Sequence, residues 1–161
     1  SDVYKRQVEH CAAPLFIDPV STVKAEKLRG LLGHVHTLKP NRIEAELLSG
    51  VKISDDATLH QAAQALLDQG VQRVFLSLGG DGVFAAQQGE THLEPICKAE
   101  MRNATGAGDA MMASLVWSFL AGRDLAESCA AGTAAAAIAV ESEETINPNM
   151  SAEAVLARAA K

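Results

Sequence analysis

The chain has 161 residues, 48% of them hydrophobic, which is enough to bury a core and to form one globular domain or part of one. Its formal net charge of −6, with no basic run longer than two residues, argues against a nucleic-acid polymer or an anionic membrane surface as a partner. No apolar stretch approaches the length of a membrane span. The cysteines are odd in number and widely spaced, which indicates free thiols in a reducing compartment, so we expect a cytoplasmic protein (Cys11, Cys97 and Cys129).

The first residues differ from the rest of the chain. Residues 1–7 are polar and show no apolar period, whereas residues 8–13 resemble the end of a helix. We therefore expect residues 1–7 to be a non-native scar and residues 8–161 to be the native part, which would begin inside a helix.

Short apolar runs then alternate with amphipathic segments. Strands are expected at 14–18, 34–38 and 71–78, with helices at 22–32, 42–49 and 55–69 between them. This alternation predicts an α/β fold with a parallel sheet and helices on its faces. His34 and His36 would share one face of a strand, but without a third ligand nearby a metal pair is disfavoured.

Two polar motifs follow the second and third of these strands. Asn41 and Glu44 are three residues apart in the first turn of a helix, where spacing alone favours a capping box. The glycine-rich stretch 77–82 suits a hairpin turn, and it also lets backbone approach a ligand at the carboxyl end of a strand. Strand-like pieces are expected after it, at 83–86, 91–94 and 96–101.

The stretch from Asn103 to Asp109 is the strongest candidate for a functional site. Its two glycines flank an alanine at the mouth of an apolar helix expected at 110–120, so bare N–H groups and the helix dipole would favour an anion. Asp109, in the first helical turn, could orient an attacking hydroxyl and take its proton, which suits phosphoryl transfer. A tight turn followed by an acidic helix start would explain the same residues without function. A dinucleotide fingerprint is disfavoured, because Met111 stands where a third glycine belongs.

Two more helices complete the chain. Gly122 ends the helix at 110–120, and Asp124 with Glu127 forms a capping box for a helix from Leu125 to about Val140. A final short helix is expected after Ser151, with an apolar face made of Val155, Leu156 and Ala159.

Residues 103–115 resemble the C-terminal signature of the PfkB (ribokinase-like) family of sugar and nucleoside kinases, although Ala104 departs from its usual pattern. The resemblance extends from Pro14 onward and corresponds to the C-terminal half of the family's three-layer α/β/α fold with a mostly parallel sheet. It implies that Asp109 is the catalytic base and that the amides of Gly106, Ala107 and Gly108 form the anion hole.

The same resemblance implies roles for the other motifs. Asn41 and Glu44 would organise Mg²⁺ and the nucleotide phosphates, with Glu44 acting through water. Ser77, Gly79 and Gly82 would lie along ATP, and Thr133 would line the adenine pocket where an asparagine is common. Asn103 and Thr105, with carbonyl groups of residues 141–148, would hold a monovalent cation, for which K⁺ is the candidate.

The implied function is ATP-dependent phosphorylation of a sugar or nucleoside. Residues 18–24 and 36–42 look like those of pseudouridine kinases, which phosphorylate the 5′-hydroxyl of pseudouridine. Other sugars or nucleosides, a non-catalytic nucleotide-binding fragment and a regulatory relative stay open as alternatives. The family's lid and most of its sugar contacts belong to its N-terminal half. We therefore expect this chain alone to be poorly stable and inactive, and we leave open whether the full-length protein is a homodimer.

Overall fold

The computed structural model describes residues 2–144 and 146–161, and the chain divides into two compact units. Unit 1 comprises Ser1–Leu78 and Phe84–Thr91, and unit 2 comprises Gly79–Val83 and His92–Lys161. Each unit is considered by itself below.

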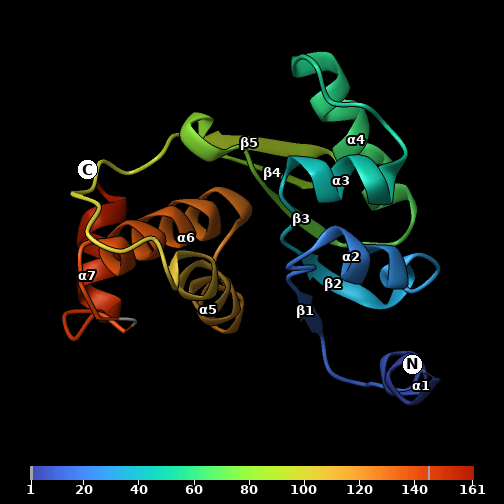
Figure 1. The fold of residues 1–161 in the computed structure, drawn as a ribbon, viewed down its shortest axis with the longest axis horizontal. Helices are drawn as coiled ribbons and strands as arrows, with labels where there is room; N and C mark the ends of the chain where they lie inside the picture. Colours follow the sequence, from blue (N-terminus) through green and yellow to red (C-terminus); the bar gives the residue numbers. More distant parts are fainter. Residues whose placement is uncertain (1, 145) are drawn as a thin grey trace. The chain divides into compact units, whose positions relative to one another are not determined.

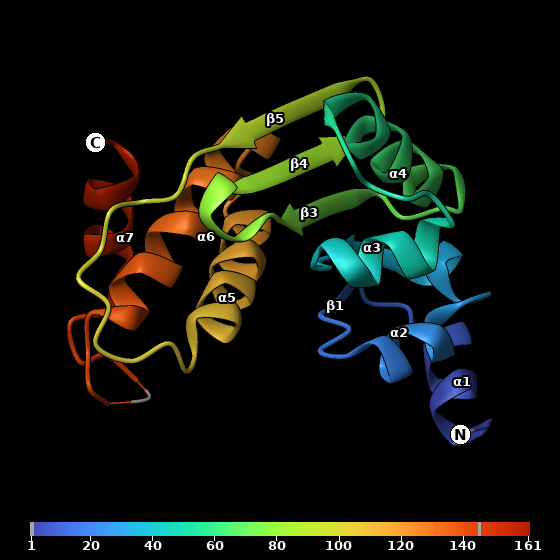
Figure 2. The same ribbon diagram turned by 45° about the horizontal axis from the view of Figure 1, so that its top comes forward.

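A five-stranded sheet has the strand order β1-β2-β3-β4-β5 (Figure 1). Its strands are β1 (Leu15–Ile17), β2 (Val35–Leu38), β3 (Arg73–Ser77), β4 (Val83–Gln87) and β5 (Glu90–Glu94). The pairs β1–β2 and β2–β3 are parallel, as the alternating pattern of the sequence predicts. The arrows of β3, β4 and β5 point in alternating directions in Figure 2, so the sheet is mixed. The parallel part places the carboxyl ends of β2 and β3 side by side, where Asn41 and Ser77 lie.

In unit 1, the first helix precedes β1 and the others belong to the connections between β1, β2 and β3. These helices are α1 (Asp2–Glu9), α2 (Thr22–Leu28), α3 (Arg42–Ser49) and α4 (Asp56–Asp68). Helix α3 packs against α2 and α4, and both α3 and α4 contact β3. The apolar face predicted for α4 is buried in full (Leu59, Ala62, Ala63, Leu66 and Leu67), and Asp55 caps the helix. Burial of this face against the sheet is the main source of stability for a helix of this length.

Unit 2 contains three helices packed in sequence, α5 (Ala107–Leu120), α6 (Leu125–Val140) and α7 (Ala152–Ala159). The capping box of Asp124 and Glu127 is present as predicted. Helix α6 consists largely of small buried residues, which allows α5 to approach it closely. Burial, followed by the charge of Glu94, raises the pKa of the Cys129 thiol on α6 to about 12. Cys129 is therefore a packing residue and not a reactive thiol.

Four expectations about the elements are wrong. Helix α2 ends at Leu28 and not near Gly33, because Arg29 turns to a non-helical ψ of 130° and Gly30 then takes a left-handed φ of +80°. A 3₁₀ helix then covers Leu32–His34, so His34 does not share a strand face with His36. Residues 96–101 form no strand, and α5 begins at Ala107, three residues before the expected start.

Other observations concern metal binding, the N-terminus and membranes. Burial, together with the positive charge of Arg73, lowers the pKa of His36, whose ring stacks on Phe16. The described residues contain no cluster of three or more His, Cys, Asp or Glu side chains suited to a metal ion. Helix α1 crosses the boundary expected between residues 7 and 8, and that boundary stays a prediction. None of the helices in the described parts of the chain could cross a membrane.

Candidate active site

The structure brings the first motif and Ser77 together in unit 1. Asn41 follows β2, Ser77 ends β3, and the two residues form a parallel β-bridge. The Ser77 N–H and hydroxyl groups both donate to the Pro40 carbonyl, at 2.9 and 3.3 Å. Polar groups from neighbouring parallel strands thus meet at the edge of the sheet where α/β proteins bind ligands.

The capping box predicted from spacing is present at Asn41 and Glu44. The Asn41 side-chain oxygen accepts the Glu44 N–H at 2.9 Å, and Glu44 Oε2 accepts the Asn41 N–H at 2.9 Å. Glu44 is only 2% exposed. Because a carboxylate has about four acceptor positions, this bond leaves capacity for water bound to Mg²⁺. Glu44 therefore fits a metal held through water, although its capping role already explains why it is here.

Gly79 and Gly82 of the stretch 77–82 are glycines for different structural reasons. Both take positive φ, +62° at Gly79 and +96° at Gly82. A Cβ atom on Gly82 would lie 2.1 Å from the carbonyl oxygen of Glu94, so packing within unit 2 requires this glycine. A Cβ atom on Gly79 would meet nothing within 4 Å, so its surface is open to a ligand. The expected hairpin turn contains a 3₁₀ helix, Gly79–Asp81.

The third motif opens α5 with a left-handed residue. Gly106 is the N-cap, with φ +90°, and it has no side chain to satisfy the first N–H groups of the helix. The Ala110 N–H donates to the Gly106 carbonyl at 2.8 Å, which leaves the earlier amides at Ala107 and Gly108 without an intrahelical acceptor. Asp109 is exposed in this first turn. The arrangement provides donors for an anion and, beside them, a carboxylate that can accept a proton.

Asn103 and Thr105 lie next to the loop that follows α6. Asn103 Oδ1 accepts the Thr105 N–H at 2.9 Å, and Asn103 Nδ2 donates to the Glu143 carbonyl at 3.2 Å. The Val140 carbonyl accepts the N–H groups of Arg102 and Asn103, at 2.8 and 3.2 Å. These bonds join the start of the motif to the end of α6 and its loop, all within unit 2.

Thr133 occupies an interior position of α6. It is 6% exposed, its hydroxyl donates to the Ala130 carbonyl at 2.9 Å, and Cys97 Sγ lies 4.0 Å from the same hydroxyl. The hydroxyl group is thus bonded to its own helix, and a role at an adenine pocket stays a prediction.

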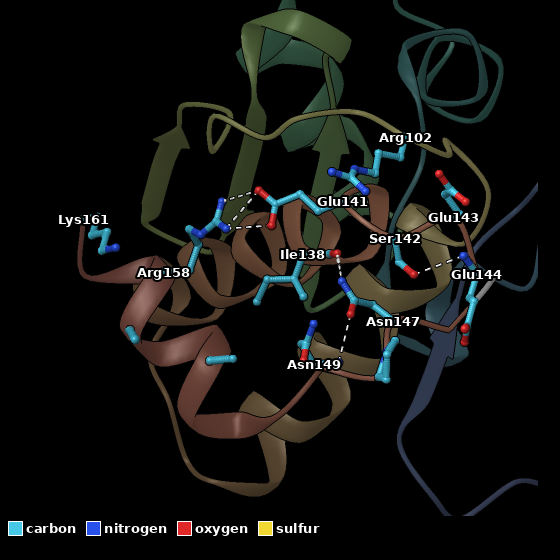
Figure 3. A pocket seen from close by; sticks show the side chains of 13 residues that line it. Arg102, Ile138, Glu141, Ser142, Glu143, Glu144, Asn147, Asn149, Arg158 and Lys161 are labelled. Carbon is cyan, nitrogen blue, oxygen red and sulfur yellow. Dashed lines mark hydrogen bonds and ion pairs between the residues drawn. The ribbon is translucent and has the colours of Figure 1, made fainter.

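A hollow of about 660 Å³ lies in unit 2 beside the loop after α6 (Figure 3). Buried Asn147 shapes the loop, donating to the Ile138 carbonyl at 2.6 Å and accepting the Asn149 N–H at 2.9 Å. Arg158 of α7 forms a bidentate ion pair with Glu141, the C-cap of α6, at 2.8 and 3.0 Å. Neither Asn147 nor Arg158 was expected as a site residue from the sequence alone. The dipeptide Asn147–Pro148 is a turn signal that could have indicated Asn147 as a loop residue, whereas no local signal indicates Arg158.

The two segments that resemble pseudouridine kinases also lie side by side. Lys39, a buried residue, pairs with Asp18 at 2.6 Å, and its N–H donates to the Ile17 carbonyl at 2.9 Å. Val20, two residues after Asp18 in the first segment, takes φ +64°, which is costly for a β-branched residue. Strain of this kind is often found at ligand-binding segments.

Comparison with known proteins gives a consistent result. The family described as "pfkB family carbohydrate kinase" matches residues 2–152. A pseudouridine kinase of Escherichia coli (strain K12) is 42% identical over 139 residues, which are 86% of this chain and 44% of that protein. The chain therefore spans less than half the length of this relative.

Solved structures show the same likeness. The crystal structure of a sugar kinase from Clostridium perfringens superposes with a TM-score of 0.92 at 30% identity, over 99% of this chain and 51% of that one. Arabidopsis thaliana ribokinase, in a complex with ribose and ATP, gives a TM-score of 0.76 at 25% identity, over 91% of this chain and 47% of that one. These similarities confirm the ribokinase-like α/β fold class expected from the sequence.

Proposed function

The chain belongs to the pfkB family of carbohydrate kinases, and on this basis we propose that its protein transfers a phosphoryl group from ATP to a hydroxyl group of a sugar or nucleoside. The observation that carries the proposal is the start of α5. There an N-cap without a side chain leaves amides free for an anion, and exposed Asp109 stands in the same helical turn.

Each residue of this turn has a task in such a reaction. The amides of Gly106, Ala107 and Gly108, with the positive end of the helix dipole, stabilise charge that develops on the transferred group. The Asp109 carboxylate orients the acceptor hydroxyl and takes its proton as the new P–O bond forms. In unit 1, Glu44 would hold a divalent ion through water, and Mg²⁺ when bound would neutralise phosphate charge. Ser77, Gly79 and Gly82 accommodate the nucleotide, with Gly79 offering the open backbone surface.

Pseudouridine is the substrate that we propose, with its 5′-hydroxyl as the acceptor. The support is the 42% identity to the Escherichia coli pseudouridine kinase, together with residues 18–24 and 36–42. The Lys39–Asp18 ion pair joins these two segments, so a substitution in either segment would disturb the position of the other.

A non-catalytic nucleotide-binding protein is the second candidate. It is favoured by the structural explanations available for two motifs. Asn41 and Glu44 form a capping box, and Gly82 is required by packing against Glu94. Binding of ATP would not separate the two candidates, whereas phosphoryl transfer would.

The test compares the protein as it is encoded with its Asp109→Asn variant. Transfer of labelled phosphate from ATP is measured with pseudouridine, uridine and ribose as acceptors. We expect pseudouridine to be preferred, and kcat of the variant to fall about 10²- to 10⁴-fold, the usual contribution of a general base. Asp68→Asn, at the exposed end of α4, is the matched control and should keep full activity.

Two results would overturn the proposal. Near-normal turnover by Asp109→Asn would remove Asp109 from the mechanism. Binding of ATP without transfer to any of the three acceptors would favour the non-catalytic candidate.

A further inference from the structure

Asn103 bonds through both ends of its side-chain amide. Its oxygen accepts the Thr105 N–H, which closes a short turn directly before Gly106. Its nitrogen donates to the carbonyl of Glu143, forty positions further along the chain. One side chain thus fixes the loop before α5 and ties it to the loop after α6.

Two of the oxygens expected to hold a monovalent cation, Asn103 Oδ1 and the Glu143 carbonyl, already accept hydrogen bonds from this chain, and so does the Val140 carbonyl just before that loop. The Val140 carbonyl uses both of its lone pairs, for the N–H groups of Arg102 and Asn103. Asn103 Oδ1 accepts the Thr105 N–H, and the Glu143 carbonyl faces the NH₂ group of Asn103. An amide NH₂ is a donor with positively polarised hydrogens, so it repels a cation and stabilises the carbonyl itself. Asn103 and the Glu143 carbonyl therefore do not fit a bound monovalent cation.

We propose that Asn103 is a positioning residue whose direct hydrogen bonds make the stability and activity of this protein independent of a monovalent cation. The consequence for activity rests on the proposed kinase function, whereas the consequence for stability does not. An aspartate at this position would instead favour a bound cation. A carboxylate would face the Glu143 carbonyl, and the two oxygens would repel each other unless a cation came between them.

The first test is thermal unfolding of the protein in potassium chloride and in choline chloride at equal ionic strength. We expect the melting temperature of the wild type to agree within about 1 °C between the two salts, since a ligand that does not bind the native state does not stabilise it. Asn103→Asp should melt about 3 °C or more higher in potassium than in choline. Asn103→Ala should melt about 2–4 °C below the wild type in both salts, because it loses both bonds.

Gln72→Glu is the matched control for charge. It adds the same negative charge at an exposed position of unit 1, and it should show no preference between the salts. Wild-type protein that melts several degrees higher in potassium than in choline would overturn the proposal. An Asn103→Ala variant with the melting temperature of the wild type would overturn it as well.

The second test measures kcat in the same salts and separates positioning from a merely structural role. Wild-type kcat should be equal in potassium and choline. Asn103→Asp should lose about 10-fold in choline and regain activity in potassium, whereas Asn103→Ala should be low in both. If Asp109 is not the base, the melting results still hold. If potassium stabilises the wild type, Asn103 loses this role while the kinase proposal stands.

Discussion

At the residue scale, Glu44 combines a structural task with a proposed catalytic one. Its carboxylate is buried and caps α3, and a carboxylate is also what a hydrated divalent ion requires. The two tasks differ in what they need, because capping requires an acceptor oxygen and metal binding requires charge. A substitution that keeps the oxygen and removes the charge can therefore separate them.

Glu44→Gln is that substitution. Its amide oxygen can still accept the Asn41 N–H, so we expect the melting temperature to change by less than about 2 °C. The Mg²⁺ concentration for half-maximal activity should rise about 10-fold, as is usual when a group that acts through metal-bound water is lost.

Asn41→Ala provides the opposite case for comparison. It removes the cap of α3 and should destabilise the protein by about 1 kcal/mol, measured by denaturant unfolding. A Glu44→Gln protein with unchanged Mg²⁺ dependence would show that Glu44 has only the capping role.

The residues of the candidate site were predictable where chemistry and local geometry coincide. Asn41, Glu44, Gly106 and Asp109 stand at helix starts, and their spacing alone indicates caps and bare amides. The bridge from Asn103 to Glu143 was not predictable from spacing. It depends on two loops that are separated along the chain and meet only through the packing of α5 on α6.

At the element scale, strong local signals located helices well and weak ones did not. The capping box of Asp124 and Glu127 located the start of α6 in the sequence, and the helix expected at 55–69 matches α4 closely. The end of α2 was misplaced because Leu31 and Leu32 continue its apolar pattern, and both are buried although the backbone has left the helix at Gly30. Apolar periodicity thus reported burial correctly and helix length wrongly.

The contact between α5 and α6 leads to a prediction about Gly132. A Cβ atom there would lie 3.2 Å from Met111 Cγ and 3.4 Å from Leu115 Cδ2. Gly132→Ala should change the free energy of unfolding by less than about 1 kcal/mol, because the gain in helix propensity offsets the tight contact with a flexible methionine. Gly132→Val should destabilise by about 1–3 kcal/mol through overpacking, measured by denaturant unfolding.

Ala136→Val is the matched control for Gly132→Val. It introduces the same side chain at a partly exposed position of the same helix and should cost only about 0.5 kcal/mol. A Gly132→Val protein as stable as the wild type would mean that contact with α5 does not restrict position 132.

At the scale of the whole molecule, the longest connection between two regular elements is the one from β5 to α5. Residues 95–106 form neither helix nor strand, which makes 12 residues, whereas the connection between α3 and α4 covers six, residues 50–55. The longer segment is held by Arg158 at the Lys98 carbonyl, by Arg102 and Asn103 at the Val140 carbonyl, and by Asn103 at the Glu143 carbonyl. The motif that we propose to bind an anion begins inside it, so the position of that motif depends on these bonds.

Limited digestion with trypsin should therefore find this segment first. A protease needs a stretch of chain that can leave the fold locally, and long irregular segments open at the lowest free energy. Apart from trimming near the N-terminus, we expect the first internal cut after Lys98 or Arg102, identified by mass spectrometry of the early fragments. Lys52 is exposed too, but Glu46 pairs with it at 3.0 Å and its connection is shorter, so it should be cut later. Replacing Lys98 and Arg102 by Gln should slow the first cut, whereas replacing Lys52 by Gln should not. Initial cleavage at Lys52 would place the weakest part of the chain in unit 1 and contradict this account of how the motif is held.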